Sequence, residues 1–538
     1  MSQHRAVTLA RNGLVSAPHY LAAQAGVRLL QAGGNAIDAA IAANATLNVV
    51  YPFGCGTGGD IFMLLYDAKS DSLNGLNGSG RAPAAATLDW FKANGHAKMP
   101  QRGILSVTVP GVVDGWQQAA EKFGRLGLAK ALQPAIEYAE QGFGVGPNLH
   151  NAIKTVLKAP WCHPSWRAVY APDGVAPPVN SILRLPELGQ TLRLIAEQGR
   201  EIFYRGKLAQ AFIEFSEREG GLFTLEDLAE HRGEWVEPLS VSYHGYRIFE
   251  MPPNTQGVTA LQMLKLAEGF DLDGSPEAAQ NIHLLVEAKK LAFADRAAYM
   301  TDLAHMKVPP AQLIAEDYIN ARRKLIDPKM AMTQVEEGAM TSAKGDTIYL
   351  CAADGEGNAV SLIQSNYMGI GSGLVVPGTG IELQNRGAYF SLDPNQINQI
   401  APRKRTLHTL IPSMAFQERS SRPAIIFGTM GGDGQAQTHL QVYTKLINYG
   451  LNIQETVEAP RWVHGKTIEN PDDGEVLQLE NRFPTETMAQ LRQLGHTVLD
   501  IESWSRQMGY AQGIVINPAN GLLMGGADPR ADSAAIGY

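Results

Sequence analysis

The chain reads Thr347-Ile348-Tyr349-Leu350-Cys351-Ala352-Ala353-Asp354 near its middle, and this apolar run predicts a buried β-strand. A turn follows at residues 355–358, and residues 359–365 predict a second strand, so the two form a hairpin. Residues 322–344, just before the hairpin, are charged, rich in Met and Ala and without a sustained apolar face, so we expect an exposed connector. A processing site needs an exposed connector that runs into a buried strand, but this arrangement is also common in proteins that are not processed.

Helical and strand-like patterns alternate around this hairpin. Apolar residues at helical spacing run from residue 19 to 43, and the break at residues 33–35 predicts two successive helices. Residues 61–66 predict a buried strand, and residues 115–320 are mostly helical with one strand-like stretch at 239–249. The pattern as a whole predicts an α/β protein.

A glycine turn at residues 54–60 raises the alternative of a dinucleotide site. Its spacing is Gly54-x-Gly56-x-x-Gly59, as in dinucleotide-binding loops. The next residues predict a strand, so no helix N-terminus follows that could hold a pyrophosphate. We therefore interpret these glycines as a tight turn between elements.

Charge and cysteine content exclude several classes of function. The net charge is −8 and no basic block occurs, which argues against a nucleic-acid partner. The three cysteines are scattered and show no CxxC spacing, so we expect neither a disulfide framework nor a zinc site. No segment approaches the ~20 apolar residues of a membrane span, and the first residues lack the apolar core of a signal peptide. We expect a cytoplasmic protein without a membrane partner.

Separated segments of the chain together resemble the γ-glutamyltransferase family of N-terminal-nucleophile hydrolases. The matches keep a consistent order from about residue 19 to near residue 530. They include Leu30-Gln31-Ala32-Gly33-Gly34-Asn35-Ala36-Ile37-Asp38, Val109-Pro110-Gly111-Val112-Val113-Asp114-Gly115-Trp116, Pro252-Pro253-Asn254-Thr255-Gln256-Gly257, Gly380-Ile381-Glu382-Leu383 and Gly525-Gly526-Ala527-Asp528-Pro529-Arg530.

The resemblance implies an αββα sandwich made as one precursor. The precursor would be cut between Asp346 and Thr347 into a large subunit, residues 1–346, and a small subunit, residues 347–538. The connector, about residues 322–346, would end the large subunit. The two subunits would stay together, and the resemblance implies neither a metal nor an organic cofactor.

Threonine suits the position after the cut. A hydroxyl group is a weak nucleophile and needs a nearby base. Cutting before Thr347 creates an α-amine with a typical pKa of about 7.7–8.0, which can act as that base near neutral pH. In the precursor, the Thr347 hydroxyl would attack the Asp346 carbonyl and form an ester that water releases.

Four further positions match functional residues of the family. Gly431 and Gly432 match the glycines whose N–H groups hold the oxyanion. Ser365 matches a threonine whose hydroxyl supports the nucleophile. Arg81 matches the arginine that clamps the α-carboxylate of the substrate, a task that suits the planar guanidinium group.

Five positions depart from the typical γ-glutamyl-processing pattern. Arg386 and Tyr389 stand where a Gln and an Asp are typical, and that Asp binds the α-ammonium group of the substrate. His408 and Thr409 replace the paired serines that contact the α-carboxylate, and Tyr367 replaces an Asn. An arginine and a neutral tyrosine cannot pair with an ammonium group, so the sequence indicates an acyl group without an α-amine.

The resulting hypothesis is a self-cleaving amidohydrolase of the acylase and oxamate amidohydrolase type, acting on a small amide that carries a carboxylate. Oxamate and the monoamides of longer dicarboxylic acids, such as glutaryl compounds, both remain open as substrates. One alternative is γ-glutamyl hydrolysis or transfer with glutathione-like substrates. Another is an unprocessed, non-catalytic binding protein. A higher oligomer of the two-subunit unit also remains open.

Overall fold

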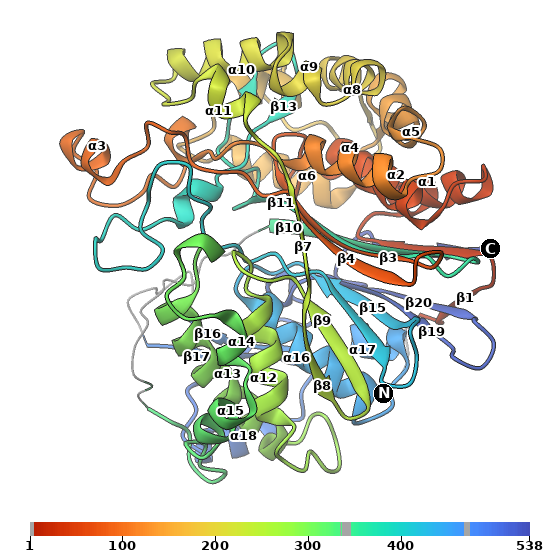
Figure 1. Cartoon of the computed structure of the whole chain (residues 1–538), viewed down its shortest axis with the longest axis vertical. Helices are drawn as coiled ribbons and strands as arrows, with labels where there is room; N and C mark the ends of the chain where they lie inside the picture. The colour runs from red at the N-terminus through yellow and green to blue at the C-terminus, as the bar shows by residue number, and fades with distance from the viewer. Residues whose placement is uncertain (1–4, 334, 336–345, 467–473) are drawn as a thin grey trace.

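The computed structural model describes residues 5–333, 335, 346–466 and 474–538. Two seven-stranded sheets face each other at the centre, and helices cover the outer face of each (Figure 1). The strand orders are β21-β2-β10-β11-β3-β4-β7 in one sheet and β1-β20-β19-β15-β14-β9-β8 in the other. The predicted αββα sandwich is confirmed.

The strands of the first sheet are β2 (Gly13–Ala17), β3 (Asp60–Asp67), β4 (Ser72–Asn77), β7 (Glu234–Val236), β10 (Asp346–Asp354), β11 (Ala359–Tyr367) and β21 (Ala534–Gly537). Those of the second sheet are β1 (Thr8–Ala10), β8 (Leu239–Tyr243), β9 (Tyr246–Glu250), β14 (Ser413–Gln417), β15 (Pro423–Thr429), β19 (Ala511–Ile516) and β20 (Leu523–Ala527). Smaller sheets contain β5 (Phe143–Gly144), β6 (Ile182–Leu183), β12 (Val375–Val376), β13 (Ile381–Glu382), β16 (Trp462–Gly465), β17 (Val476–Glu480) and β18 (Val498–Ile501).

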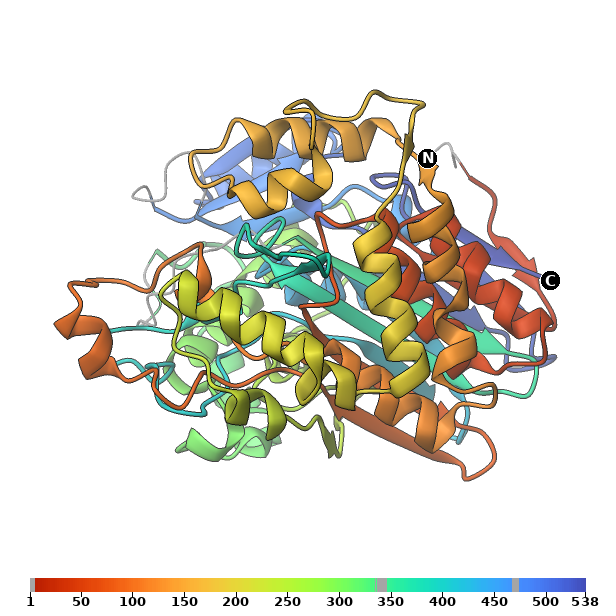
Figure 2. The ribbon, with the colours of Figure 1, turned by 90° about the horizontal axis from the view of Figure 1, so that it is seen from above.

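The helices on the side of the first sheet are α1 (Tyr20–Gln31), α2 (Ala36–Val50), α4 (Val112–Phe123), α5 (Leu128–Gln141), α6 (Pro147–Leu157), α7 (Pro164–Tyr170), α8 (Pro186–Gln198), α9 (Glu201–Tyr204), α10 (Lys207–Arg218) and α11 (Leu225–Ala229). Figure 2 shows this layer from above. The opposite layer contains α12 (Gly257–Ala267), α13 (Ala279–Tyr299), α14 (Pro310–Leu313), α15 (Glu316–Arg323), α16 (Gly434–Ile447), α17 (Ile453–Glu458) and α18 (Thr485–Gln493). The short α3 (Leu88–Ala93) lies at one side, and single 3₁₀ turns occur at Ile104–Ser106, Leu303–His305, Arg386–Tyr389 (η3) and Arg506–Met508.

The predicted hairpin lies at the centre of its sheet. Strand β10 pairs with β11 and β2, and β11 pairs with β3, all antiparallel. Tyr349 and Cys351 pack into the core between the two sheets, whereas Ile348 and Leu350 pack toward the helices. Burial on both faces explains why this stretch is continuously apolar instead of alternating.

Other sequence predictions are confirmed with shifted bounds. The segment from residue 19 to 43 forms α1 and α2, and Asn35 begins α2 with a capping box to Asp38. The strand-like stretch at 239–249 forms the hairpin of β8 and β9. Residues 334 and 336–345 of the predicted connector lie outside the described residues. In the part before them, Leu325 and Met330 are exposed, whereas Ile326 and Ala331 are buried.

The glycine turn before β3 permits a close backbone contact. A Cβ atom at Gly58 would lie 2.3 Å from the carbonyl oxygen of Glu382, and one at Gly59 would lie 2.9 Å from that of Ser365. These glycines let the turn pack against the end of β11 and against the segment that leads to Arg386. This agrees with our interpretation of the turn, because a strand and not a helix follows it.

Candidate active site

Thr347 lies at the start of β10 and is buried, with 1% of its surface exposed. Its hydroxyl donates a hydrogen bond to the Ser365 hydroxyl on β11, with 3.1 Å between the two oxygens. The Ser365 oxygen also accepts the N–H of Tyr367 at 2.7 Å. The strand register is irregular between Asp346 and Ile348, the two neighbours of Thr347. The structure thus brings together the two hydroxyl groups that the sequence pairs.

Gly431 and Gly432 connect β15 to α16 across from this strand. Their φ angles are 137° and 56°, in the region that favours glycine. A Cβ atom at Gly428 of β15 would lie 2.3 Å from the Tyr349 ring, so β15 passes close to the start of β10 just before the turn. We call Gly431 and Gly432 the glycine pair.

Arg386 begins η3, and 1% of its surface is exposed. Its guanidinium group lies 4.2 Å from the centre of the Tyr367 ring, and Nη1 donates to the Thr409 hydroxyl at 3.4 Å. Nε and Nη2 have no hydrogen-bond partner within the described part of the chain. Burial lowers the pKa of Arg386 to about 10, so the side chain keeps its positive charge at neutral pH. A buried cation with two free donors can bind an anion.

His408 and Asp60 form a buried pair beside Arg386. His408 Nε2 lies 3.0 Å from Asp60 Oδ2, and the N–H of Gly80 donates to Asp60 Oδ1 at 2.9 Å. Burial raises the pKa of Asp60 to about 7, although Arg386, the Gly80 N–H and Arg405 oppose the shift. Burial and then Arg386 lower the pKa of His408 well below its usual value, so the imidazole is neutral. Asp60 lies opposite Ser365 in the sheet.

Tyr389, at the end of η3, is partly exposed and connects the pocket to the glycine pair. Its ring packs edge-on against Tyr367, with 5.5 Å between the ring centres. Its hydroxyl donates to Oδ1 of Asp433, the residue after Gly432, at 2.9 Å. The predicted pocket residues Tyr367, Arg386, Tyr389, His408 and Thr409 therefore form one cluster.

Arg81 contacts residues outside this cluster. Its Nη2 donates to Glu234 at 2.8 Å and its Nη1 to the carbonyl oxygen of Arg403 at 3.0 Å, and Asp302 lies 3.6 Å from Nη1. The side chain is 37% exposed. The guanidinium group is thus occupied by carboxylates of the protein, and its role as a substrate clamp stays a prediction.

Four residues that contact the site had no predicted role: Asp60, Asp433, Gln256 and Arg296. Asp60 directly follows Gly58 and Gly59, and Asp433 directly follows Gly431 and Gly432. An isolated acid directly after two glycines is the sequence signal that could have identified both residues. Gln256 lies within the family motif at residues 252–257, and Ala294-Asp295-Arg296 is a further segment that resembles the family, but both lie far from the hairpin in sequence.

One group of side chains has the composition of a metal site. His283, Glu287 and His496 are buried and close together. His283 Nδ1 already hydrogen-bonds His496 Nε2 at 2.8 Å, and Glu287 pairs with Lys290 at 2.7 Å. The two histidines therefore bind each other and Glu287 binds a lysine outside the group, so we assign no metal to these residues.

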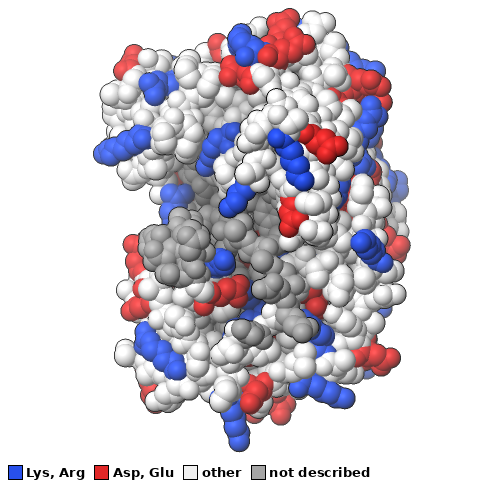
Figure 3. All heavy atoms as spheres, turned by 90° about the vertical axis from the view of Figure 1, so that its left-hand side faces the viewer, with Lys and Arg blue, Asp and Glu red and all other residues white. Residues whose placement is uncertain are grey.

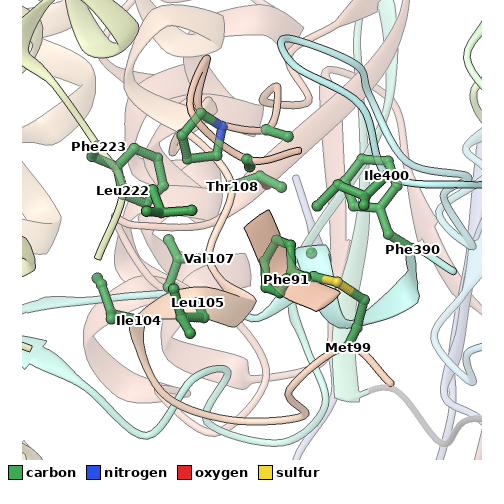
Figure 4. A pocket seen from close by; sticks show the side chains of 14 residues that line it. Phe91, Met99, Ile104, Leu105, Val107, Thr108, Leu222, Phe223, Phe390 and Ile400 are labelled. Carbon is green, nitrogen blue, oxygen red and sulfur yellow. The ribbon is translucent and has the colours of Figure 1, made fainter. Parts of the chain in front are cut away.

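A small apolar cavity lies next to η3 (Figure 4). Phe91, Met99, Phe223, Phe390 and Ile400 contribute to its lining. Its lining contains no titratable group. The cavity therefore offers shape and apolar surface, and the reactive groups lie outside it.

Charges of both signs are mixed on the surface. Lys and Arg side chains alternate with Asp and Glu on the described part of the face drawn in Figure 3. Within the described ranges, none of the helices has the length and apolar character that crossing a membrane requires.

Comparisons with known proteins identify the family of the chain. The family model of gamma-glutamyltranspeptidase matches residues 22–538. The glutathione hydrolase-like YwrD proenzyme of Bacillus subtilis is 40% identical over 526 residues, covering 97% of this chain and 98% of that protein. The oxamate amidohydrolase proenzyme of Klebsiella pneumoniae is 38% identical over 533 residues, covering 98% of each. The crystal structure of cephalosporin acylase from Bacillus halodurans has a TM-score of 0.93 and 42% identity, covering 100% of this chain and 98% of that one.

The family match spans nearly the whole chain and includes strand β10, which carries Thr347. The similar proteins are named as hydrolases, amidohydrolases and acylases. The chain is therefore an enzyme of the gamma-glutamyltranspeptidase family of N-terminal-nucleophile hydrolases, in its acylase and amidohydrolase branch.

Proposed function

We propose that this enzyme hydrolyses small amides that carry a carboxylate, of the oxamate or dicarboxylic monoamide type. The observation that supports the proposal is Arg386, a buried cation whose Nε and Nη2 have no partner within the described residues. Arg386 lies against the ring of Tyr367. The N–H of Tyr367 and the hydroxyl of Thr347 both donate to the Ser365 hydroxyl. Arg386 can therefore hold a carboxylate close to the nucleophile.

Maturation would begin with attack of the Thr347 hydroxyl on the carbonyl carbon of Asp346. The peptide bond breaks as the ester forms, and the Thr347 nitrogen becomes an amine. Water then hydrolyses the ester, which leaves a large subunit, residues 1–346, and a small subunit that begins at Thr347. The oxamate amidohydrolase of Klebsiella pneumoniae is likewise named a proenzyme.

In turnover, the α-amine of Thr347 takes the proton of the hydroxyl as the oxygen attacks the amide carbon. The N–H groups of Gly431 and Gly432 would hold the oxyanion, and removal of one such donor typically costs about 3–4 kcal/mol. The C–N bond then breaks and ammonia or an amine leaves with the proton. Water hydrolyses the acyl ester and restores the Thr347 hydroxyl, so no cofactor is required in this scheme.

Nearby acids do not suit an α-ammonium group. Asp60 pairs with His408, and its raised pKa makes it a weak partner for a cation. Asp433 pairs with Arg296, with 2.6 Å between Nη1 and Oδ1. Tyr389, at the position of the family's typical Asp, is neutral at physiological pH. An acyl group with a carboxylate and no amine therefore fits best.

A substrate panel tests the proposal. Purified enzyme is incubated with oxamate, glutaryl-p-nitroanilide and γ-glutamyl-p-nitroanilide, and kcat/KM is measured for each. We expect the γ-glutamyl compound to react at least about tenfold more slowly than the better of the other two, since an unpaired ammonium group costs more than 1.4 kcal/mol. A preference for the γ-glutamyl compound would refute the assignment of the acyl pocket.

The pKa of Asp60 leads to a prediction on pH. Below pH 7 Asp60 is protonated, and the charge of Arg386 is available to a substrate carboxylate. Above pH 7 the Asp60 carboxylate competes with the substrate for Arg386. We expect KM for an anionic substrate to rise about tenfold between pH 6 and 8. In Asp60→Asn the rise should disappear, and because the Thr347 amine titrates in both proteins, the difference between their KM profiles reports on Asp60. Parallel profiles would contradict the prediction.

A further inference from the structure

We propose that Arg296 and Gln256 are positioning residues that fix the glycine pair for catalysis and couple it to the acyl pocket through Asp433. The inference rests on the proposed role of Gly431 and Gly432 in holding the oxyanion. Both positioning residues come from the chain before the Asp346–Thr347 bond, whereas Asp433 and the glycine pair come after it.

Arg296 is the centre of the network. It is buried, with 4% of its surface exposed, and its guanidinium group stacks 4.1 Å from the centre of the Phe293 ring. Nη1 donates to Asp433 Oδ1 and to Gln256 Oε1, both at 2.6 Å. One nitrogen therefore fixes both the acid that follows the glycine pair and the amide of Gln256.

Gln256 links Arg296 to two backbone carbonyl groups. Its Oε1 accepts from Arg296, so its Nε2 must point the opposite way. Nε2 donates to the carbonyl oxygen of Gly432 at 3.2 Å and to that of Thr409 at 2.8 Å. A single amide thus joins the glycine pair to the segment of the acyl pocket that contains His408 and Thr409.

The glycine pair needs such support. Glycine reaches φ angles of 137° and 56° without steric cost, but it is also the residue with the most alternative conformations. An oxyanion site works only when its N–H groups already point at the developing charge. Fixing the Gly432 carbonyl and the side chain of Asp433, the next residue, restricts the peptide plane that ends the glycine pair.

Asp433 also connects the turn to the pocket wall. Its Oδ1 accepts from the Tyr389 hydroxyl as well as from Arg296. Tyr389 packs against Tyr367, and the guanidinium group of Arg386 lies over the ring of Tyr367. A substrate that orders Arg386, Tyr367 and Tyr389 therefore also acts on the glycine pair through the carboxylate of Asp433. The glycine pair would in turn stabilise the transition state of that substrate.

Gln256→Glu is the main test. The exchange keeps the shape and the acceptor for Arg296 but removes both hydrogen bonds that Nε2 donates. We expect kcat with the best substrate of the panel to fall about 10²-fold while KM changes less than about threefold, because the turn is misaligned but the pocket keeps Arg386. Cleavage of the precursor before Thr347, monitored by gel electrophoresis, should slow together with kcat. This second readout needs no added substrate, so it still tests the positioning role if the proposed substrate class is wrong.

Gln441→Glu is the matched control. Gln441 is also buried, and its Nε2 also donates to two carbonyl oxygens, of Gln437 at 3.1 Å and of Trp462 at 2.9 Å. We expect a similar loss of Tm with kcat and precursor cleavage nearly unchanged. Equal losses of kcat in both variants, or a change of KM alone in Gln256→Glu, would overturn the proposal.

Tyr389→Phe serves if Gln256→Glu does not fold. It removes only the hydroxyl that binds Asp433. We expect about a tenfold loss of kcat, the effect of one hydrogen bond to a charged group, and a smaller delay of precursor cleavage. Tyr443→Phe is its control. Tyr443 lies further along α16, and the substitution removes a buried hydroxyl that hydrogen-bonds the Ser413 hydroxyl. Unchanged kcat in Tyr389→Phe would refute the coupling between Asp433 and the pocket.

Discussion

Thr347→Ala is expected to remain a single chain of 58.1 kDa and to lose amidase activity by at least about 10⁴-fold. Alanine has no hydroxyl to attack either the Asp346 carbonyl or a substrate. Without cleavage the α-amine that serves as base does not form either. One substitution thus removes the nucleophile and prevents formation of the base, which is why we expect this variant to have the largest effect.

Thr347→Ser separates the hydroxyl from the rest of the side chain. Serine keeps the oxygen that donates to Ser365 but lacks the methyl group of threonine. We expect cleavage and turnover to persist at reduced rates. Gel electrophoresis over several days and an amide-hydrolysis assay measure both. Two fragments from Thr347→Ala, or activity from its uncut chain, would exclude the proposed mechanism.

The contact between Thr347 and Ser365 was expected from the family resemblance, since the hairpin by itself predicted only that the two residues lie on neighbouring strands. The turn did not determine which residues face each other, because the observed register has Ala353 opposite Ala359 and is irregular beside Thr347. The αββα architecture followed from the family motifs, which the whole-chain match confirms. The glycine pair was identified in the same way.

The pairs that shape the pocket were not predictable in this manner. Asp60 and His408 are 348 positions apart and meet only when the glycine turn packs beside β11. Arg296 and Asp433 come from α13 and the start of α16, 137 positions apart. Such contacts depend on how layers pack, for which the sequence has no periodic signal. Arg81 is a different case, because the family resemblance assigned its guanidinium group to a substrate carboxylate, whereas in the structure Glu234, distant in sequence, binds it.

Arg386→Gln is expected to lower kcat/KM for oxamate about 10²–10³-fold, which corresponds to about 3–4 kcal/mol. Glutamine is smaller than arginine and stands at this position in the typical γ-glutamyl-processing pattern described above. It offers one neutral amide in place of a charged fork, so a bound carboxylate loses its charge-assisted hydrogen bonds. Arg386→Lys keeps the charge but not the planar fork, and we expect it to recover only part of the loss.

Oxamide, the neutral analogue of oxamate, separates recognition from folding. It has the same scissile amide but no carboxylate, so its slow hydrolysis should change little in Arg386→Gln. Arg200→Gln is the matched control, because Arg200 is also a buried arginine and pairs with Asp114 away from the site. Equal losses with oxamate and oxamide would mean that Arg386 supports the fold of the pocket. A loss confined to oxamate would mean that the charge of Arg386 selects the substrate, and the acyl specificity of this enzyme would then depend on a residue that departs from the typical γ-glutamyl-processing pattern.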